Sequence, residues 1–399
     1  MDGLTLQPRA VQFGIYRDGD NNLDGNQCNV LAQAVAVSKH DGAVGFTVQD
    51  TTARNGAALH TNSYQIADGR VRGVQVGKAH DMANPKNLAA FVAQTLDDAR
   101  KSGAKQSWIE LVDHGGGDGG GLEADSKHAL MSMPGIASAI AEGERLYAAA
   151  HPEDAGRGID GVVANQCLMS TMGFADALSK VGVKYLAASP ETMISPGTPS
   201  AVAASIADNV GDPSAMARGV VRDVMKADYR IDGMPYAPAA AYDVLDLAPA
   251  KLAAADGAIK TLDDALVQGA RNGERTAIRS DVAREDGMVR FPGSDGLPWH
   301  ADRPAIATYG RIAADARLSA EIRSDASAAE NAVGNLVLAH AESNAYAPFG
   351  GSDYRDAVGP TVHLPTSPAQ VDPWAPKVSE TENAFYHATD EDQLAGVLA

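Results

Sequence analysis

The chain has 399 residues, of which 45% are apolar and 21% are charged, and its formal net charge is −18 at pH 7. This composition is ordinary for a globular protein, and the length allows a large core. The negative charge argues against binding to nucleic acid or to an anionic membrane surface, because both rely on clustered Lys and Arg. It fits mild attraction of cationic peptides, although a well-solvated acidic surface needs no partner.

Two cysteines are present, Cys28 and Cys167, too few for a disulfide framework in so long a chain. No apolar run approaches the ~18 residues of a membrane helix. The N-terminus, MDGLTLQPRAVQFGIY, lacks a basic start followed by an apolar stretch, so we see no Sec-type signal. We therefore expect a chain that stays in the cytoplasm, leaves by another route, or is written here in mature form.

The first 200 residues alternate predicted strands and helices. Short apolar runs indicate strands, and amphipathic stretches with helical spacing lie between them. A turn at Asp68-Gly69 within an alternating stretch indicates a hairpin over residues 64–76. The predicted strands are residues 11–16, 44–49, 108–112, 159–164 and 184–188, and the predicted helices are residues 27–38, 85–101, 134–150 and 169–181. This alternation is typical of an α/β fold with a mostly parallel sheet.

After about residue 200 the pattern changes to long Ala-rich helical stretches. They cover residues 200–227, 248–270 and 302–342, with strand-like pieces at 239–244 and 358–364. We therefore predict a catalytic α/β region over residues 1–245. A helical C-terminal region over residues 246–399 follows, with a late strand near 358–364.

Two reactive side chains follow predicted strands directly, His114 after WIELVD and Cys167 after GVVANQ. A helix separates these strands, and a helical crossover places parallel strands side by side. Ligands of parallel sheets gather at the carboxyl ends of strands. Cys167 offers a nucleophilic thiol and His114 an imidazole for proton transfer. The glycines from Gly115 onward leave backbone N–H groups open to a substrate carbonyl, and a helix predicted after Cys167 would favour the thiolate.

Other sequence patterns indicate function less strongly. Asp20, Asn22 and Asp24 match the first half of a calcium loop, but Leu31 stands where that loop needs Glu. An acidic turn is the favoured interpretation, so we expect no required cofactor and leave calcium open. The run GGGDGGG matches a dinucleotide fingerprint only formally, because no helix begins at once. The absence of HExxH, paired CxxC and GxSxG argues against a zinc enzyme and an α/β-hydrolase. Cys28 has no nearby His, and we interpret it as structural.

Four stretches occur in an order that points to a family: FGIYRDGDNNLDG, IELVDHGGG, VVANQCLMSTMGFADAL and VKYLAASPETMISPGTP. At these residues the chain resembles the clostripain-like (C11) cysteine peptidases, relatives of the caspases. The resemblance implies a caspase-like α/β/α sandwich, a Cys167/His114 dyad, and an oxyanion hole from the N–H groups of Gly115 and Cys167. It also implies cleavage after basic residues, frequent self-cleavage between the His and Cys strands, and calcium dependence in some members.

One position departs from the family pattern. The family usually has Asp two residues before the cysteine, where it pairs with a basic P1 side chain, and this chain has Asn165. Asn cannot supply that charge, which puts a preference for basic P1 residues in doubt. Ser189 and Glu191, in the turn after the next strand, are further substrate-binding candidates, and Glu191 could restore part of the charge. The candidate self-cleavage points are Lys127, Arg145 and Arg157.

We predict a cysteine endopeptidase that hydrolyses peptide bonds through a thioester on Cys167, with His114 as general acid and base. The expected partners are protein or peptide substrates, with no nucleic acid and no membrane, and we expect a monomer. Two alternatives stay open. The first, which Asn165 favours, is a caspase-like protein that has lost hydrolysis and serves in binding or scaffolding. The second is an acyltransferase or ligase that uses the same thioester.

Overall fold

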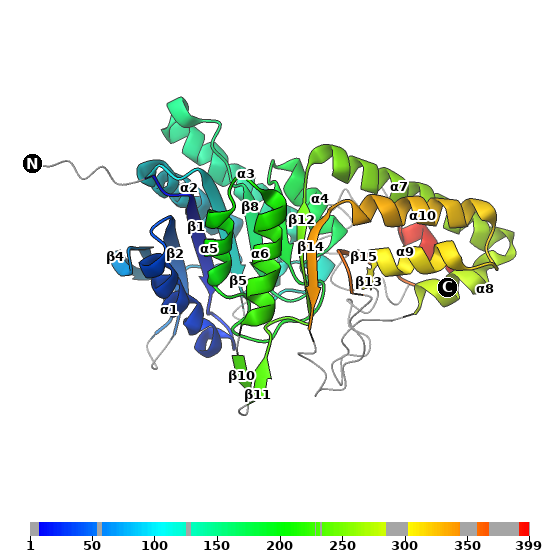
Figure 1. Ribbon diagram of the computed structural model, residues 1–399, viewed down its shortest axis with the longest axis horizontal. Coiled ribbons are helices and arrows are strands. Elements are labelled where there is room, and N and C mark those ends of the chain that lie inside the picture. The colour runs from blue at the N-terminus through cyan, green and yellow to red at the C-terminus, as the bar shows by residue number, and fades with distance from the viewer. Residues whose placement is uncertain are drawn as a thin grey trace, which may run out of the picture.

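The computed structural model describes residues 8–53, 58–124, 129–227, 229–231, 234–284, 302–343, 357–366 and 391–398. A nine-stranded sheet with the order β14-β12-β9-β8-β5-β1-β2-β3-β4 crosses the molecule, and helices cover both faces (Figure 1). Its strands are β1 (Val11–Asp18), β2 (Val44–Thr52), β3 (His60–Ala67), β4 (Arg70–Lys78), β5 (Gln106–Val112), β8 (Gly161–Asn165), β9 (Tyr185–Ala188), β12 (Ala241–Asp246) and β14 (Val337–Glu342).

The middle of the sheet is parallel and its two ends are antiparallel. β2, β1, β5, β8 and β9 pair in parallel, whereas β3 and β4 at one end and β12 and β14 at the other run antiparallel to their neighbours. The predicted hairpin is confirmed as β3 and β4. It turns at Asp68 and Gly69, whose φ angles of 52° and 70° fit a tight two-residue turn.

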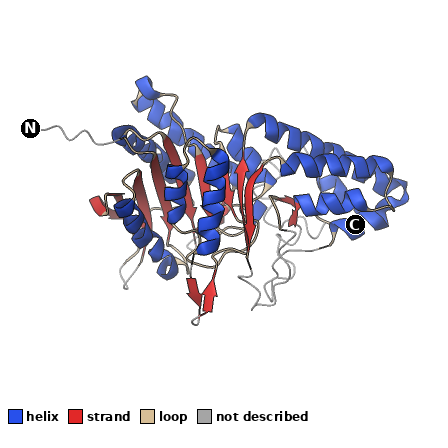
Figure 2. Cartoon of the chain, in the orientation of Figure 1, coloured by secondary structure: helices blue, strands red, loops and turns tan. Residues whose placement is uncertain are grey.

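Two layers of helices enclose the sheet (Figure 2). On one face, apolar side chains of α1 (Asp24–His40), α5 (Ala201–Asp208) and α6 (Pro213–Lys226) pack with Phe13 and Trp108. The other face is covered by α2 (Pro85–Ser102), α3 (Met133–Ala150), α4 (Met172–Lys180) and α7 (Pro249–Gly269). This arrangement confirms the predicted α/β/α sandwich. No helix among the described residues is long and apolar enough to cross a membrane.

The helix boundaries follow local signals. In α2, Asn84 caps the N-terminus by accepting a hydrogen bond from Lys86 N–H at 3.0 Å, and Pro85 occupies the first turn. Gly103, with φ 67°, ends the helix in the left-handed conformation. Capping and amphipathic spacing are readable in sequence, which is why the prediction for this helix was confirmed.

The C-terminal half extends from one end of the sandwich as a group of helices (Figure 2). Beyond α7, it contains α8 (Arg275–Val282), β13 (Asp302–Pro304), α9 (Ala305–Ala314), α10 (Ala320–Gly334), β15 (Thr361–His363) and α13 (Glu391–Leu398). The smaller elements of the chain are β6 (Gly121–Ala124), β7 (Ala129–Met131), β10 (Tyr229–Ile231), β11 (Met234–Tyr236), η2 (Gly117–Gly119), η3 (Pro152–Asp154) and η4 (Ala270–Glu274).

Two predicted helices were partly wrong. The stretch 302–342 begins with β13 and ends with β14, which pairs antiparallel with β12 at the end of the sheet. Its last residues, VLAHAE, are Ala-rich, so their composition gave no strand signal, and pairing with a distant strand decides their conformation. The helix predicted from residue 169 begins only at Met172. The predicted late strand is confirmed as β15, which pairs with β13.

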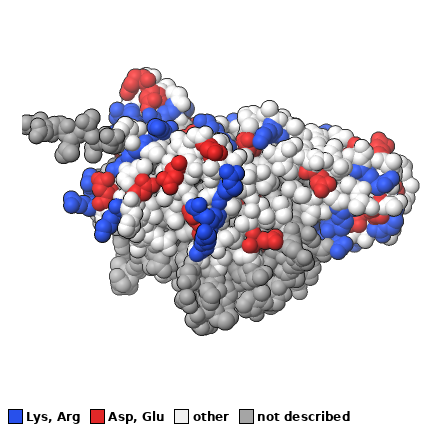
Figure 3. All heavy atoms as spheres, viewed as in Figure 1, with Lys and Arg blue, Asp and Glu red and all other residues white. Residues whose placement is uncertain are grey.

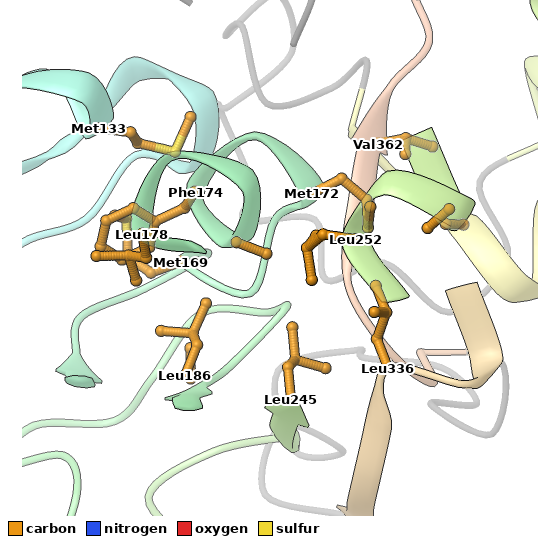
Figure 4. Close-up of a cluster of buried hydrophobic side chains, with 14 of the residues drawn as sticks. Met133, Met169, Met172, Phe174, Leu178, Leu186, Leu245, Leu252, Leu336 and Val362 are labelled. Carbon is orange, nitrogen blue, oxygen red and sulfur yellow. The ribbon is translucent and has the colours of Figure 1, made fainter. Parts of the chain in front are cut away.

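The hydrophobic core joins the two halves of the chain. Apolar side chains of α4 and β9 meet others that come from β12, α7 and β15 (Figure 4). The labelled members are Met133, Met169, Met172, Phe174, Leu178, Leu186, Leu245, Leu252, Leu336 and Val362. The helix that follows the candidate nucleophile is therefore anchored by residues from both sides of the predicted boundary at residue 245.

Candidate active site

His114 and Cys167 follow adjacent strands of the sheet. β5 and β8 run parallel, and the last residues in their register are Val112 and Asn165. His114 and Cys167 each stand two residues beyond that pair, so both lie at the carboxyl edge of the sheet. Asp113 N–H donates to Asn165 O at 3.4 Å across the strand ends. The register thus brings together the two residues that the sequence singled out.

The loops that carry these residues touch at Gly115. A Cβ built on Gly115 would lie 2.2 Å from Cys167 O and 2.9 Å from the Cβ of Gln166, so no larger residue fits without displacing the cysteine loop. Gln166 Nε2 also donates to His114 O at 2.9 Å. The backbones of Gly115 and Cys167, the two predicted oxyanion donors, are therefore in direct contact.

The half-buried His114 imidazole is oriented by an amide. Its Nε2 lies 2.7 Å from Asn22 Oδ1. Because an amide oxygen only accepts, a neutral imidazole in this contact carries its proton on Nε2 and leaves Nδ1 as the proton acceptor. No hydrogen bond links His114 to Cys167 within the part of the chain that the structure describes. Sequence reasoning weighed Asn22 only as a calcium ligand.

The Cys167 thiol is half-buried and accepts a hydrogen bond from Met193 N–H at 3.2 Å. Burial raises the pKa of the thiol above its usual value, the hydrogen bonds from the backbone N–H groups of Met193 and Cys167 itself act in the opposite direction, and Glu191 adds to the rise. The resting thiol is therefore protonated at neutral pH, so its reaction requires a proton acceptor.

The turn after Cys167 is pinned to the loop that follows β9. Leu168, with φ 65°, adopts a left-handed conformation that is unusual for a non-glycine residue. Leu168 N–H donates to Glu191 O and Ser170 N–H donates to Ser189 O, both at 3.0 Å. These residues occupy the interval before α4, so Cys167 is not at a helix N-terminus. The prediction that a helix N-terminus stabilises the Cys167 thiolate is therefore wrong.

Asn165 is buried and its amide is engaged within the protein. Its Nδ2 donates to Glu110 Oε1 at 2.8 Å, and its Oδ1 accepts from Thr198 N–H at 2.9 Å. A Cβ on Gly197 would lie 1.7 Å from Asn165 Oδ1, which shows how closely the loop covers this side chain. Burial raises the pKa of Glu110 to about 8, against the opposing effect of the Asn165 hydrogen bond. Glu110 is a residue that sequence reasoning missed, and its only signal is a charge inside the apolar strand WIELV.

Ser189 and Glu191, the other predicted substrate-binding residues, are fully buried beside the cysteine turn. Ser189 Oγ donates to Ala241 O at 2.7 Å and accepts from Glu191 N–H at 3.0 Å. The structure therefore places both residues in the loop that supports Cys167, where Ser189 joins that loop to β12.

The three calcium candidates have separate partners. Asp24 Oδ1 accepts from Arg17 Nη2 at 2.7 Å and from Thr52 Oγ1 at 2.7 Å. Asn22 contacts His114, and Asp20 N–H donates to Asp18 Oδ1 at 2.9 Å. Among the described residues, no group of three or more His, Cys, Asp or Glu side chains is placed to hold a metal ion.

Two buried carboxyl groups lie beside the His114 strand end, and sequence reasoning missed both. Burial raises the pKa of Asp18 to about 7. Burial, together with the nearby Asp18, also raises the pKa of Asp113 well above its usual value, and Asn21 Nδ2 donates to Asp113 Oδ1. The shift favours the protonated form of Asp113, which reduces the negative charge next to His114.

The candidate self-cleavage points differ in setting. Arg145 is exposed on α3 and pairs with Glu142, whereas Arg157 Nη1 donates to Ala104 O at 2.9 Å. Lys127 lies outside the described residues. Neither arginine contacts Cys167 or His114 in the described part of the chain.

The C-terminal half also contacts the turn that follows Cys167. The fully buried carboxylate of Asp243 accepts from Ser170 Oγ at 2.9 Å, from His340 Nδ1 at 2.9 Å and from Gly359 N–H at 3.1 Å. Thr361 N–H donates to Ser170 O at 2.8 Å. These contacts join the cysteine turn to β12, β14 and the strand β15, which lie far along the chain.

No protein-family model matches the chain, and no curated protein matches its sequence. Solved structures do match. A secreted C11 cysteine protease from Bacteroides thetaiotaomicron, "iotapain", is 15% identical, with a TM-score of 0.63 over 96% of this chain and 99% of that chain. An inactive zymogen of a C11 protease from Parabacteroides distasonis is also 15% identical, with a TM-score of 0.60 over the same shares of the two chains. The strand order, the helical layers and these matches together show that this chain has the fold of the clostripain-like C11 cysteine proteases.

Proposed function

We propose that this protein is a cysteine endopeptidase with Cys167 as nucleophile and His114 as general acid and base. The observation that carries the proposal is the register of β5 and β8, which sets His114 and Cys167 at matching positions beyond two neighbouring strands. The similarity to C11 proteases supports the same activity. The contact at Gly115, which leaves room only for glycine, fixes the two loops relative to each other.

In the proposed reaction, Cys167 Sγ attacks the scissile carbonyl carbon while the thiol proton passes to His114. The carbonyl oxygen becomes an oxyanion held by the N–H groups of Gly115 and Cys167. The C–N bond then breaks as the imidazolium protonates the leaving amine, which yields a thioester. Water attacks the thioester with His114 as base, and the free thiol and the acid product are released.

The hydrogen bond that His114 Nε2 donates to Asn22 Oδ1 gives a physical reason for these roles. With the Nε2 proton held by Asn22 Oδ1, Nδ1 is the nitrogen available to take the thiol proton. The protonated resting thiol makes that acceptor necessary, because only a thiolate is an effective nucleophile.

A strong preference for Arg or Lys at P1 is not part of the proposal. Asn165 carries no charge, and its amide is bonded to Glu110 and Thr198. The Glu110 carboxyl itself, with a pKa of about 8, is largely neutral at pH 7. We propose that this region accepts uncharged P1 side chains, and that cleavage of a mixed peptide library will show this preference.

The decisive experiment compares three variants on such a library. Cys167→Ala and His114→Ala are expected to remove turnover. Cys28→Ala, which alters the other cysteine of the chain, is expected to keep it. All three should retain the circular dichroism spectrum of the wild type. Full activity in Cys167→Ala would refute the assignment of the nucleophile.

A thiol-reactive peptidyl probe separates the enzyme from a scaffold with the same fold. The enzyme is expected to be labelled at Cys167, and His114→Ala is expected to lower the labelling rate. An intact wild-type protein that neither cleaves any peptide nor reacts with the probe would instead be a binding or scaffolding protein.

A further inference from the structure

β4 forms one end of the sheet, on the far side of β5, β1, β2 and β3 from the cysteine strand β8 (Figure 1). Every residue of β4 is exposed, and the strand pairs on one side with β3. Among the described residues, no strand pairs with its other side. An edge of this kind presents unpaired backbone N–H and C=O groups that a further strand could use.

The exposed edge is also unusually apolar. Four large apolar side chains are exposed among the described residues, and three of them stand on this strand: Val71 at 48%, Val74 at 58% and Val76 at 68%. A Cβ built on Gly73 meets no atom within 4 Å, so open space lies beside the middle of the strand. β-branched residues such as valine are favoured in paired strands, so the composition of β4 suits pairing with a further strand.

The strand is basic in a strongly acidic protein. Arg70, Arg72 and Lys78 belong to β4, which contains no Asp or Glu, whereas the whole chain has a net charge of −18. Lys and Arg side chains project at this end of the molecule (Figure 3). Arg72 forms an ion pair with Asp68 in the hairpin turn at 3.2 Å, and both side chains are exposed. The edge therefore attracts negative charge.

The charges argue against a second copy of this chain as the occupant. A pairing of two β4 strands would bring together two segments that each carry three basic residues and no acidic one. Like charges directly opposite each other destabilise a strand pair.

We propose that β4 is a docking edge that binds an extended, acidic segment of a partner protein by strand addition. Backbone hydrogen bonds to β4 would give the affinity, as in other strand-addition complexes. Acidic side chains would pair with Arg70, Arg72 and Lys78, and apolar ones would cover Val74 and Val76. The site is independent of the proposed peptidase activity.

The test uses the full chain carrying Cys167→Ala, so that no peptide is cleaved, and fluorescence anisotropy of short labelled peptides. A peptide of alternating Val and Glu is expected to bind at least about tenfold more tightly than one of alternating Val and Lys, because each opposite-charge pair on a strand adds a small favourable term. Raising the salt concentration should reduce the difference.

Matched variants locate the binding. Arg70→Glu combined with Arg72→Glu should remove the preference for the acidic peptide, whereas Arg145→Glu, an exposed arginine on α3, should leave it unchanged. N-methylation of alternate amides along one edge of the peptide should abolish binding, and methylation along the opposite edge should not. Circular dichroism confirms that the variants are folded.

Three outcomes would overturn the proposal. The first is equal affinity for the two peptides, and the second is binding that survives N-methylation of either edge. The third is a concentration-dependent dimer of the protein that Val74→Glu dissolves, because this result would assign the edge to a second copy.

Discussion

The contact between Gly115 and Cys167 makes a direct prediction about side-chain size. Gly115→Ala would force its Cβ against Cys167 O, so the cysteine loop must move. Displacements of about 1 Å in a catalytic group cost on the order of a hundredfold in rate. We expect kcat/KM to fall at least about tenfold. Gly42→Ala is the matched control, because a Cβ there meets no atom within 4 Å. Equal activity in the two variants would contradict this account.

The Glu110 carboxyl predicts how stability depends on pH. Its pKa is raised from 4.5 to about 8 in the folded protein, so the folded state holds a proton that the unfolded state releases. The contribution of this group is fully present below the unfolded value of 4.5 and is lost as the pH rises through about 8. Wild-type stability should therefore fall across this window.

Glu110→Gln tests that prediction, because glutamine keeps an acceptor for Asn165 Nδ2 and does not titrate. Thermal melts between about pH 5 and pH 8 should show a smaller decline in the variant. Glu142→Gln, at an exposed carboxylate on α3, is the control and should follow the wild type. If the melting temperature of Glu110→Gln fell as steeply with pH as that of the wild type, Glu110 would not be the source of the decline.

At the scale of elements, the pairing of β12 with β14 depends on an ion pair. Burial disfavours the charged form of His340, but the hydrogen bond and charge of Asp243, with a smaller effect of Glu342, raise the pKa of His340 overall. This contribution is present below the ordinary histidine pKa of 6.5 and is lost as the pH rises through the raised pKa of the folded state.

His340→Gln should therefore cost more stability at about pH 6 than at about pH 8. A hydrogen bond to a charged group contributes about 1.5–3 kcal/mol, which sets the scale at the lower pH. Urea unfolding at the two pH values measures the difference. His40→Gln, an exposed histidine at the end of α1, should show no such dependence. If His340→Gln lost the same stability at both pH values, the ion pair with Asp243 would not be the cause of the loss.

At the scale of the whole molecule, the core predicts how the chain unfolds. One cluster of buried apolar residues runs from Tyr16 to Leu398, and β14 completes a sheet that begins with β1. We expect the regions on either side of residue 245 to unfold in one transition, because neither buries its apolar surface alone. Circular dichroism and intrinsic fluorescence should give the same midpoint in denaturant. Two separated transitions would show that the halves are independent domains.

The sequence located the edge that carries His114 and Cys167 because its signals are local. His114 and Cys167 directly follow apolar runs of strand length, and the intervening helix makes those strands parallel neighbours. The contacts that complete the site join distant segments: Asn22 with His114, Glu110 with Asn165, and Ser170 with Asp243. No periodicity or turn signal encodes such pairs. The same reason explains the misassigned β14, whose conformation is decided by β12.

The bond from Thr361 N–H to Ser170 O has a consequence for the timing of synthesis. Ser170 belongs to the turn that follows Cys167, yet its backbone partner is translated 191 positions later. A growing polypeptide on the ribosome therefore lacks part of the frame around Cys167 until Thr361 has been made. The order of translation thus delays complete assembly of this turn until long after Cys167 itself has been made.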